Sequence, residues 1–139
     1  MAEHKDNPFQ DPNFTPVEYD PQYILQVNHL KKYFPIKSGM IAHTVGYVKA
    51  VDGVTFNLKR GTTMGLVGES GCGKTTTLRM IAGFESPDEG EIYLGDEPIN
   101  ALTPNKRDTA MVFQSYALLP HYNVFDNVAY GLKLRKVPK

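Results

Sequence analysis

The eight residues from Gly68 to Thr75, GESGCGKT, have the types and spacing best suited to chemistry in this sequence, because they match G-x-x-x-x-G-K-[ST] in full. Glycines at three positions let the backbone turn tightly, so that successive N–H groups point inward and form a nest for an anion. A helix that begins near Lys74 would present the positive end of its dipole to the same anion. The sequence therefore predicts a phosphate-binding loop.

The side chains of this loop predict how a nucleoside triphosphate and its metal would be held. Lys74 is predicted to reach the β- and γ-phosphate oxygens, which gives it a catalytic role, and the Thr75 hydroxyl is predicted to bind Mg²⁺. Thr76 is expected to help hold the α-phosphate. The predicted nucleotide-binding residues are Gly68, Glu69, Ser70, Gly71, Cys72, Gly73, Lys74, Thr75 and Thr76.

Cys72 admits two interpretations. A thiol near a helix N-terminus is favoured as thiolate, which would suit a redox switch. The alternative is a small residue tolerated at a variable position of the loop. As the single cysteine it excludes a disulfide within the chain and fits a reducing compartment.

The loop needs a strand before it and a helix after it. The apolar run 63–67 predicts a central strand buried on both faces. Residues 74–82 have helical character, with Leu78 and Ile81 on one side and Gly83 placed to end the helix. A second short apolar run, 109–113, predicts another strand.

Several other segments have recognisable patterns. Alternation from Val54 to Lys59 predicts a half-buried strand, and Ile36 to about Tyr47 is expected to be a loop or a hairpin excursion. Further strands are predicted over 23–28 and 91–94. Asn123 is placed to cap a helix that has Asp126 in its first turn and an apolar repeat of Val124, Val128 and Leu132. Lys106 and Arg107 are expected to be solvated.

Chain length and composition limit the number of domains and the possible classes of protein. The 139 residues have room for one domain, with a disordered, Pro-rich acidic tail expected over 1–22 and the folded part over 23–139. Fifteen basic residues balance fifteen acidic ones, and they do not form the basic cluster that nucleic-acid binding requires. No apolar run reaches the roughly 18–20 residues of a membrane span. A cytoplasmic protein of mixed α/β class is the expectation.

Several segments together resemble the N-terminal half of an ABC transporter ATP-binding subunit over roughly residues 24–139. The resemblance implies an α/β P-loop NTPase fold, with a RecA-like ABC ATPase core and an N-terminal antiparallel β portion. Besides the phosphate loop, the segments that carry it are Tyr33-Phe34, Ala50–Phe56, Leu78–Gly83, Pro87–Ile92 and Met111–His121.

The same resemblance implies functional residues outside the phosphate loop, with ATP and Mg²⁺ as cofactors. Phe34 would stack on adenine, with Tyr33 as second choice; the alternative is that both rings belong to the core. Gln114 would help bind Mg²⁺ or the attacking water. The segment Tyr116–His121 would receive a helix of the transmembrane permease subunit, although core and turn is also an interpretation of these residues.

The resemblance implies two partners, a second ATP-binding subunit in a dimer and a transmembrane permease subunit. It also implies that the chain is a cytoplasmic protein, peripheral on the inner face of the cell membrane. The family hydrolyses ATP. Its signature stretch, the acidic strand with the catalytic Glu and the switch His do not occur before Lys139. The expectation is a truncated chain that binds nucleotide weakly and has negligible turnover alone.

The cargo stays open between two groups of importers. Asn28–Ile36 and Gly68–Ser70 resemble oligopeptide importer ATPases. Thr75–Glu85 and Asn105–Gln114 resemble polyamine, sugar and ion importer ATPases. The change falls across Ser70–Lys74, and a recombination or an artificial join there is a hypothesis that explains it.

Two other functions stay open beside an importer ATPase. One is an inactive nucleotide-binding or interaction half-domain. The other is a different P-loop enzyme, such as a small-molecule kinase or a GTPase. Asn105-Lys-Arg-Asp108 matches the guanine-reading pattern by its letters, but it follows Thr75 by only 30 residues, too early for the usual GTPase order.

Overall fold

The computed structural model describes residues 15, 18–39, 43–113 and 118–137. It divides into two compact units, Met1–Thr109 (unit 1) and Ala110–Lys139 (unit 2). No helix in the described ranges is long and apolar enough to cross a membrane. The division at residue 22 stays a prediction; just before it, Asp20 N donates to Gln26 Oε1 at 2.8 Å and Pro21 O accepts from Arg60 Nε at 3.1 Å.

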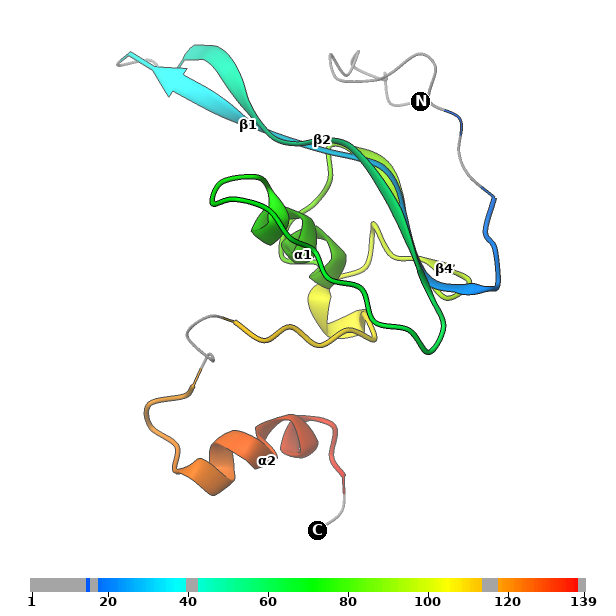
Figure 1. Cartoon of the computed structure of the whole chain (residues 1–139). Helices are drawn as coiled ribbons and strands as arrows, with labels where there is room; N and C mark the ends of the chain where they lie inside the picture. Colours follow the sequence, from blue (N-terminus) through cyan, green and yellow to red (C-terminus); the bar gives the residue numbers. More distant parts are fainter. Residues whose placement is uncertain (1–14, 16–17, 40–42, 114–117, 138–139) are drawn as a thin grey trace, which may run out of the picture. The chain divides into compact units, whose positions relative to one another are not determined.

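Unit 1 is built on a four-stranded sheet in which every neighbouring pair is antiparallel, in the order β2-β1-β3-β4 (Figure 1). The sheet confirms the predicted N-terminal antiparallel portion. Its strands are β1 Tyr23–Ser38, β2 His43–Lys59, β3 Glu89–Leu94 and β4 Glu97–Pro98.

β1 and β2 form a long hairpin, which decides between the two structures predicted for Ile36 to about Tyr47, a loop or a hairpin. The segment from Ile36 to Tyr47 is a hairpin, since Ile36 pairs with Gly46 and Ser38 with His43. Further along β2 the predicted alternation is confirmed. The partly buried residues there are Val54, Phe56 and Leu58, and the exposed ones are Thr55, Asn57 and Lys59.

The helix that follows the phosphate loop, α1, spans Lys74–Ala82 and confirms the prediction in both bounds. Gly83 ends it with a left-handed φ of 84°, and its N–H donates to Met80 O at 3.2 Å. Helix and sheet share one core, whose buried members are Val27, Leu30, Val51, Met80, Ile92 and Ile99.

The buried face of α1 differs from the predicted one. Thr77 and Met80 are buried, whereas Leu78 is 47% exposed and Ile81 is only partly buried. The physical reason is the 100° step between helical residues, because a helix that directs Met80 at the sheet turns Leu78 away from it.

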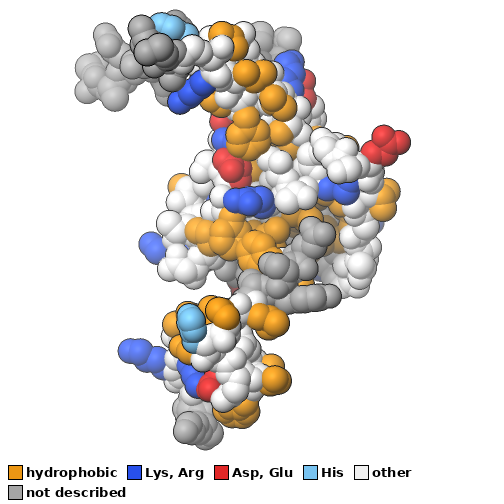
Figure 2. Space-filling view, turned by 90° about the vertical axis from the view of Figure 1, so that its left-hand side faces the viewer, with side chains coloured by type: hydrophobic (Ala, Val, Ile, Leu, Met, Phe, Trp, Pro, Cys, Tyr) orange, Lys and Arg blue, Asp and Glu red, His pale blue; other side chains and the backbone are white. Residues whose placement is uncertain are grey.

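Two predicted strands do not form, the central strand over 63–67 and the second short strand over 109–113. Among the described residues, 63–67 and 109–113 lack strand pairing, and Val67 and Val112 are 89% and 83% exposed. A strand needs a neighbour that accepts its backbone hydrogen bonds, and an apolar run does not provide one. Figure 2 shows hydrophobic side chains on the surface of unit 1.

Unit 2 contains one described helix, α2, which spans Val124–Leu134. The predicted cap is confirmed, since Asn123 Oδ1 accepts from Asp126 N at 2.8 Å. Lys133 Nζ lies 2.5 Å from Asp126 Oδ1. The residues of the predicted apolar repeat are exposed: Val124, Val128 and Leu132.

Candidate functional site

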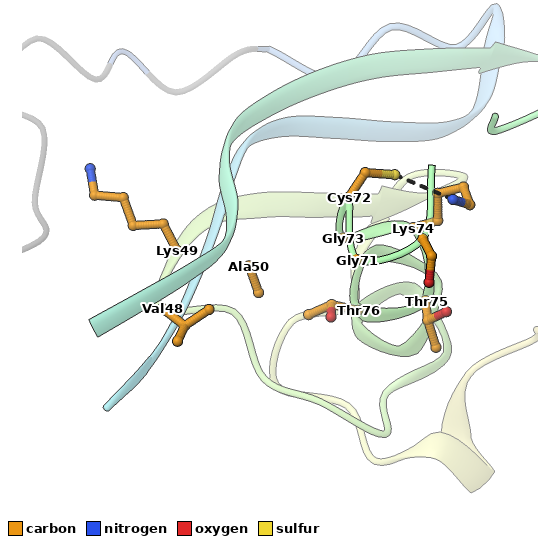
Figure 3. A pocket seen from close by; sticks show the side chains of 10 residues that line it. Val48, Lys49, Ala50, Gly71, Cys72, Gly73, Lys74, Thr75 and Thr76 are labelled. Carbon is orange, nitrogen blue, oxygen red and sulfur yellow. Dashed lines mark hydrogen bonds between the residues drawn. The ribbon is translucent and has the colours of Figure 1, made fainter. Parts of the chain in front are cut away.

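A cavity of about 350 Å³ lies between β2 and the loop that leads into α1 (Figure 3). It brings together seven of the nine predicted loop residues, Ser70 to Thr76. From β2 it is lined by Val48, Lys49 and Ala50, which no sequence motif assigns to the site.

Two glycines give the loop its shape. Gly71 and Gly73 have φ values of 84° and 85°, in the left-handed region that side chains disfavour. A Cβ on Gly73 would lie 2.1 Å from the carbonyl oxygen of Ala50. Gly73 is therefore required twice, by its own backbone conformation and by the close approach of β2. The role of Ala50 could not be predicted from its residue type, because its backbone carbonyl makes the contact.

Lys74 lies across the phosphate loop. Its Nζ donates to Gly68 O at 2.5 Å and to Glu69 O at 2.7 Å. These bonds connect Gly68 and Glu69, which do not line the cavity, to Lys74, which does. An ammonium thus stands at the mouth of a glycine-rich turn, as anion binding requires.

Two hydrogen bonds from Thr77 connect the first turn of α1 to the phosphate loop. Both the backbone N–H and the Oγ1 of Thr77 donate to Gly73 O, at 2.9 and 3.0 Å. Thr75 is exposed and Thr76 half-buried, and Figure 3 shows their side chains leaving the helix in different directions. The predicted metal-binding hydroxyl of Thr75 is therefore accessible at the start of the helix.

Cys72 forms part of the cavity wall. Its exposed thiol lies 3.3 Å from Lys74 Nζ. The backbone N–H of Lys74 and then its ammonium lower the pKa of this thiol, because both donate to the thiolate. Thiolate therefore forms at lower pH than in a free cysteine.

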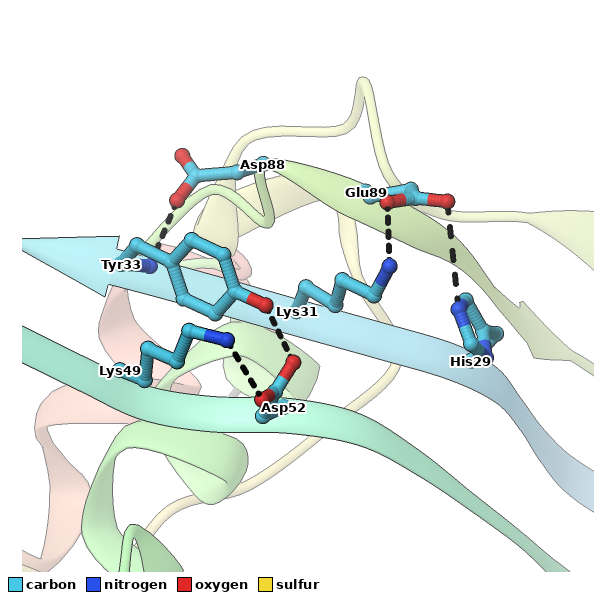
Figure 4. Close-up of polar contacts among 7 residues, drawn as sticks. All are labelled: His29, Lys31, Tyr33, Lys49, Asp52, Asp88 and Glu89. Carbon is cyan, nitrogen blue, oxygen red and sulfur yellow. Dashed lines mark hydrogen bonds and ion pairs between the residues drawn. The ribbon is translucent and has the colours of Figure 1, made fainter. Parts of the chain in front are cut away.

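The aromatic pair divides between the two faces of the hairpin. Phe34 is 38% exposed and pairs with Val48, a cavity residue, so both side chains stand on the same face of the two strands. Tyr33 is 8% exposed on the face turned away from α1 (Figure 4), where its hydroxyl donates to Asp52. Burial and that bond raise the pKa of Tyr33 to about 12.

Part of the predicted site lies outside the described residues. Gln114 and Tyr116 belong to this part, so their roles stay predictions. Of the segment predicted to receive the permease, 118–121 is described; Leu118 is 66% exposed and Leu119 is half-buried.

Arg107 is a residue whose role sequence reasoning missed; the expectation that it is solvated is wrong. It is 6% exposed, and its Nη1 donates to Met80 O and Ile81 O at 2.6 and 2.9 Å. Its Nε donates to Leu102 O at 2.9 Å and its Nη2 to Asn100 O at 3.3 Å. Burial lowers the pKa of Arg107, but a guanidinium stays charged in proteins. The side chain thereby fixes the C-terminal end of α1.

Curated relatives match most of the chain. The spermidine/putrescine import ATP-binding protein PotA of Bacteroides thetaiotaomicron is 47% identical over 116 residues, which cover 84% of this chain and 23% of the relative. The trehalose/maltose import ATP-binding protein MalK of Thermococcus litoralis is 55% identical over 100 residues, which cover 68% and 27%. The chain thus spans about a quarter of the length of these relatives.

A solved structure gives the same result for the fold. The dimeric post-hydrolysis state of the ATP-binding cassette MJ0796, bound to ADP and Pi, superposes with a TM-score of 0.68 at 27% identity, over 83% of this chain and 49% of that one. The chain therefore has the fold of part of an ABC ATPase cassette. The sequence profile described as ABC transporter matches residues 51–138, more than half of the sequence, and the chain therefore belongs to the ABC transporter family.

Proposed function

We propose that the chain is the ATP-binding part of an ABC importer subunit, which couples ATP binding and hydrolysis to solute uptake. The observation that carries the proposal is the glycine-rich loop packed on β2 with the Lys74 ammonium across it. Import ATP-binding proteins for polyamines and for trehalose and maltose are among its relatives, and a related cassette binds ADP and Pi.

The residues present fit a magnesium-bound triphosphate. The left-handed turn at Gly71 and Gly73 and the N-terminus of α1 would cradle phosphate oxygens, and Lys74 would pair with them. Thr75 would help hold Mg²⁺, which neutralises phosphate charge when bound. Gln114, which lies outside the described residues, stays the second predicted Mg²⁺ ligand.

The base would stack on Phe34. This ring is partly exposed beside the cavity residue Val48, whereas Tyr33 is buried on the other face with its hydroxyl bonded to Asp52. Phe34 is therefore the better supported of the two predicted aromatic residues.

Phe34→Ala is expected to weaken MgATP binding about tenfold, because stacking on an aromatic ring contributes roughly 1–3 kcal/mol per base. Isothermal titration calorimetry of the 139-residue chain measures this change. Tyr33→Phe is the matched control, since it removes only the hydroxyl bonded to Asp52, and it should leave affinity unchanged. Native affinity in Phe34→Ala would remove the stacking role, and tighter binding of GTP than of ATP would favour another P-loop enzyme.

The partners follow from the same function. We propose that the complete subunit dimerises through its cassette, as the MJ0796 cassette does, and that it docks a permease through Tyr116–His121 at the inner face of the membrane. Co-purification of the permease with the native subunit, and its loss when the exposed Leu118 is replaced by Asp, tests the docking segment.

A further inference from the structure

The side chain of Lys32 is held by the turn that follows α1. Its ammonium donates to Ser86 O at 2.8 Å and lies 3.1 and 3.2 Å from carboxylate oxygens of Asp88 and Glu85. An ammonium has three N–H donors, and these three acceptors can use all of them. With its side chain only 13% exposed, Lys32 is fixed in one position.

The same turn also contacts the backbone of β1. Asp88 Oδ2 accepts from Tyr33 N at 2.7 Å, a bond drawn in Figure 4, while its other oxygen faces Lys32. Two consecutive residues of β1 are thus tied to one carboxylate, so this part of the hairpin keeps its place relative to the turn.

Lys32 in turn supports the ring of Phe34. The two residues stand two positions apart in β1, which places both side chains on one face of the strand, and Lys32 Nζ lies 5.5 Å from the ring centroid. A cation at this distance is attracted to the aromatic π-system. The ring stays 38% exposed, next to the cavity residue Val48.

We propose that Lys32 is a positioning residue for nucleobase recognition, because it orients Phe34 beside the cavity without itself touching the phosphates. The inference rests on the proposed ATP-binding function. A ring held in place loses less conformational freedom when a base stacks on it than a ring that rotates freely. Removal of the ammonium should therefore weaken ligands that carry a base and spare ligands that do not.

The test compares two ligands, MgATP and magnesium tripolyphosphate, in titrations of the full 139-residue chain. Lys32→Met keeps most of the aliphatic length and removes the charge. It should weaken MgATP about fivefold, the size of a partly desolvated cation–π contact, and change tripolyphosphate affinity less than about twofold. In a Phe34→Ala background the same substitution should have no further effect on MgATP.

Two variants separate orientation from general charge. Lys32→Arg keeps a cation with several donors and should bind MgATP within about twofold of the native chain. Lys59→Met removes an exposed positive charge elsewhere on β2 and should leave both affinities unchanged. If circular dichroism shows Lys32→Met unfolded, Glu85→Gln removes one charged acceptor instead, with an expected fall of about twofold for MgATP alone.

Three results would overturn the inference while leaving phosphate binding intact: no effect of Lys32→Met, an equal fall for both ligands, or a full effect in the Phe34→Ala background. A native chain that binds neither ligand would instead remove the proposed function, and this inference with it.

Discussion

Replacement of Lys74 by alanine should abolish measurable binding of MgATP. The ammonium lies at the loop, bonded to two of its carbonyl oxygens, and it is the cation best placed to meet the phosphates. Loss of one partner from a desolvated charge pair weakens binding by about 2–5 kcal/mol, which is roughly 30-fold to several thousand-fold. Calorimetric titration with MgATP and with magnesium tripolyphosphate should show the loss for both ligands.

The matched control is Lys106→Ala, which removes an exposed lysine outside the cavity and should bind as the native chain does. Thermal melts of both variants show whether the fold is retained. Native affinity in a folded Lys74→Ala variant would refute the assignment of the phosphate loop.

Arg107→Ala should have the largest effect on stability, a decrease of about 3 kcal/mol or more in the free energy of unfolding. The reason is that the carbonyl oxygens of Ile81, Leu102 and Asn100 lose their arginine donor in a largely buried place. Met80 O loses one of two donors and keeps the Gly83 N–H. A buried acceptor left without a partner costs about 1–3 kcal/mol. Urea unfolding followed by circular dichroism measures the change.

Two further variants define the geometry behind this effect. Arg107→Lys restores a charge but cannot donate to four acceptors in the fork of a guanidinium, so it should recover only part of the loss. Arg79→Ala, at an exposed arginine in the last turn of α1, should change stability by less than about 1 kcal/mol. Equal losses of unfolding free energy in Arg79→Ala and Arg107→Ala would contradict the conclusion that Arg107 fixes the C-terminal end of α1.

Features with local signals could be predicted from the sequence. The phosphate loop, the end of α1 at Gly83 and the cap at Asn123 each depend on residues within a few positions of one another. The alternation in β2 is local too, and it correctly gave the partly buried face. The hairpin from Ile36 to Tyr47 was one of two predicted options, because only the register with the opposite strand decides between them.

Features that depend on distant partners could not be predicted. The apolar pattern of 63–67 indicates a strand, but strand formation depends on a neighbour that the pattern does not specify. The burial of Arg107 depends on carbonyl oxygens up to 27 positions away, and a backbone oxygen has no sequence signature. The close approach of Gly73 to Ala50 could not be predicted either, because it too involves a backbone oxygen.

The bonds of Arg107 have a consequence for the response of α1 to salt. The negative end of this helix already has a buried cation, whereas its first turn contains no acidic residue. The positive, N-terminal end of α1 therefore has no negative partner within the helix, and a bound phosphate would supply one. That end of α1 lies at the exposed phosphate loop. Mobile ions screen exposed charges far more than buried ones. Rising ionic strength should therefore weaken the hold on phosphate while leaving the brace at the other end of the helix intact.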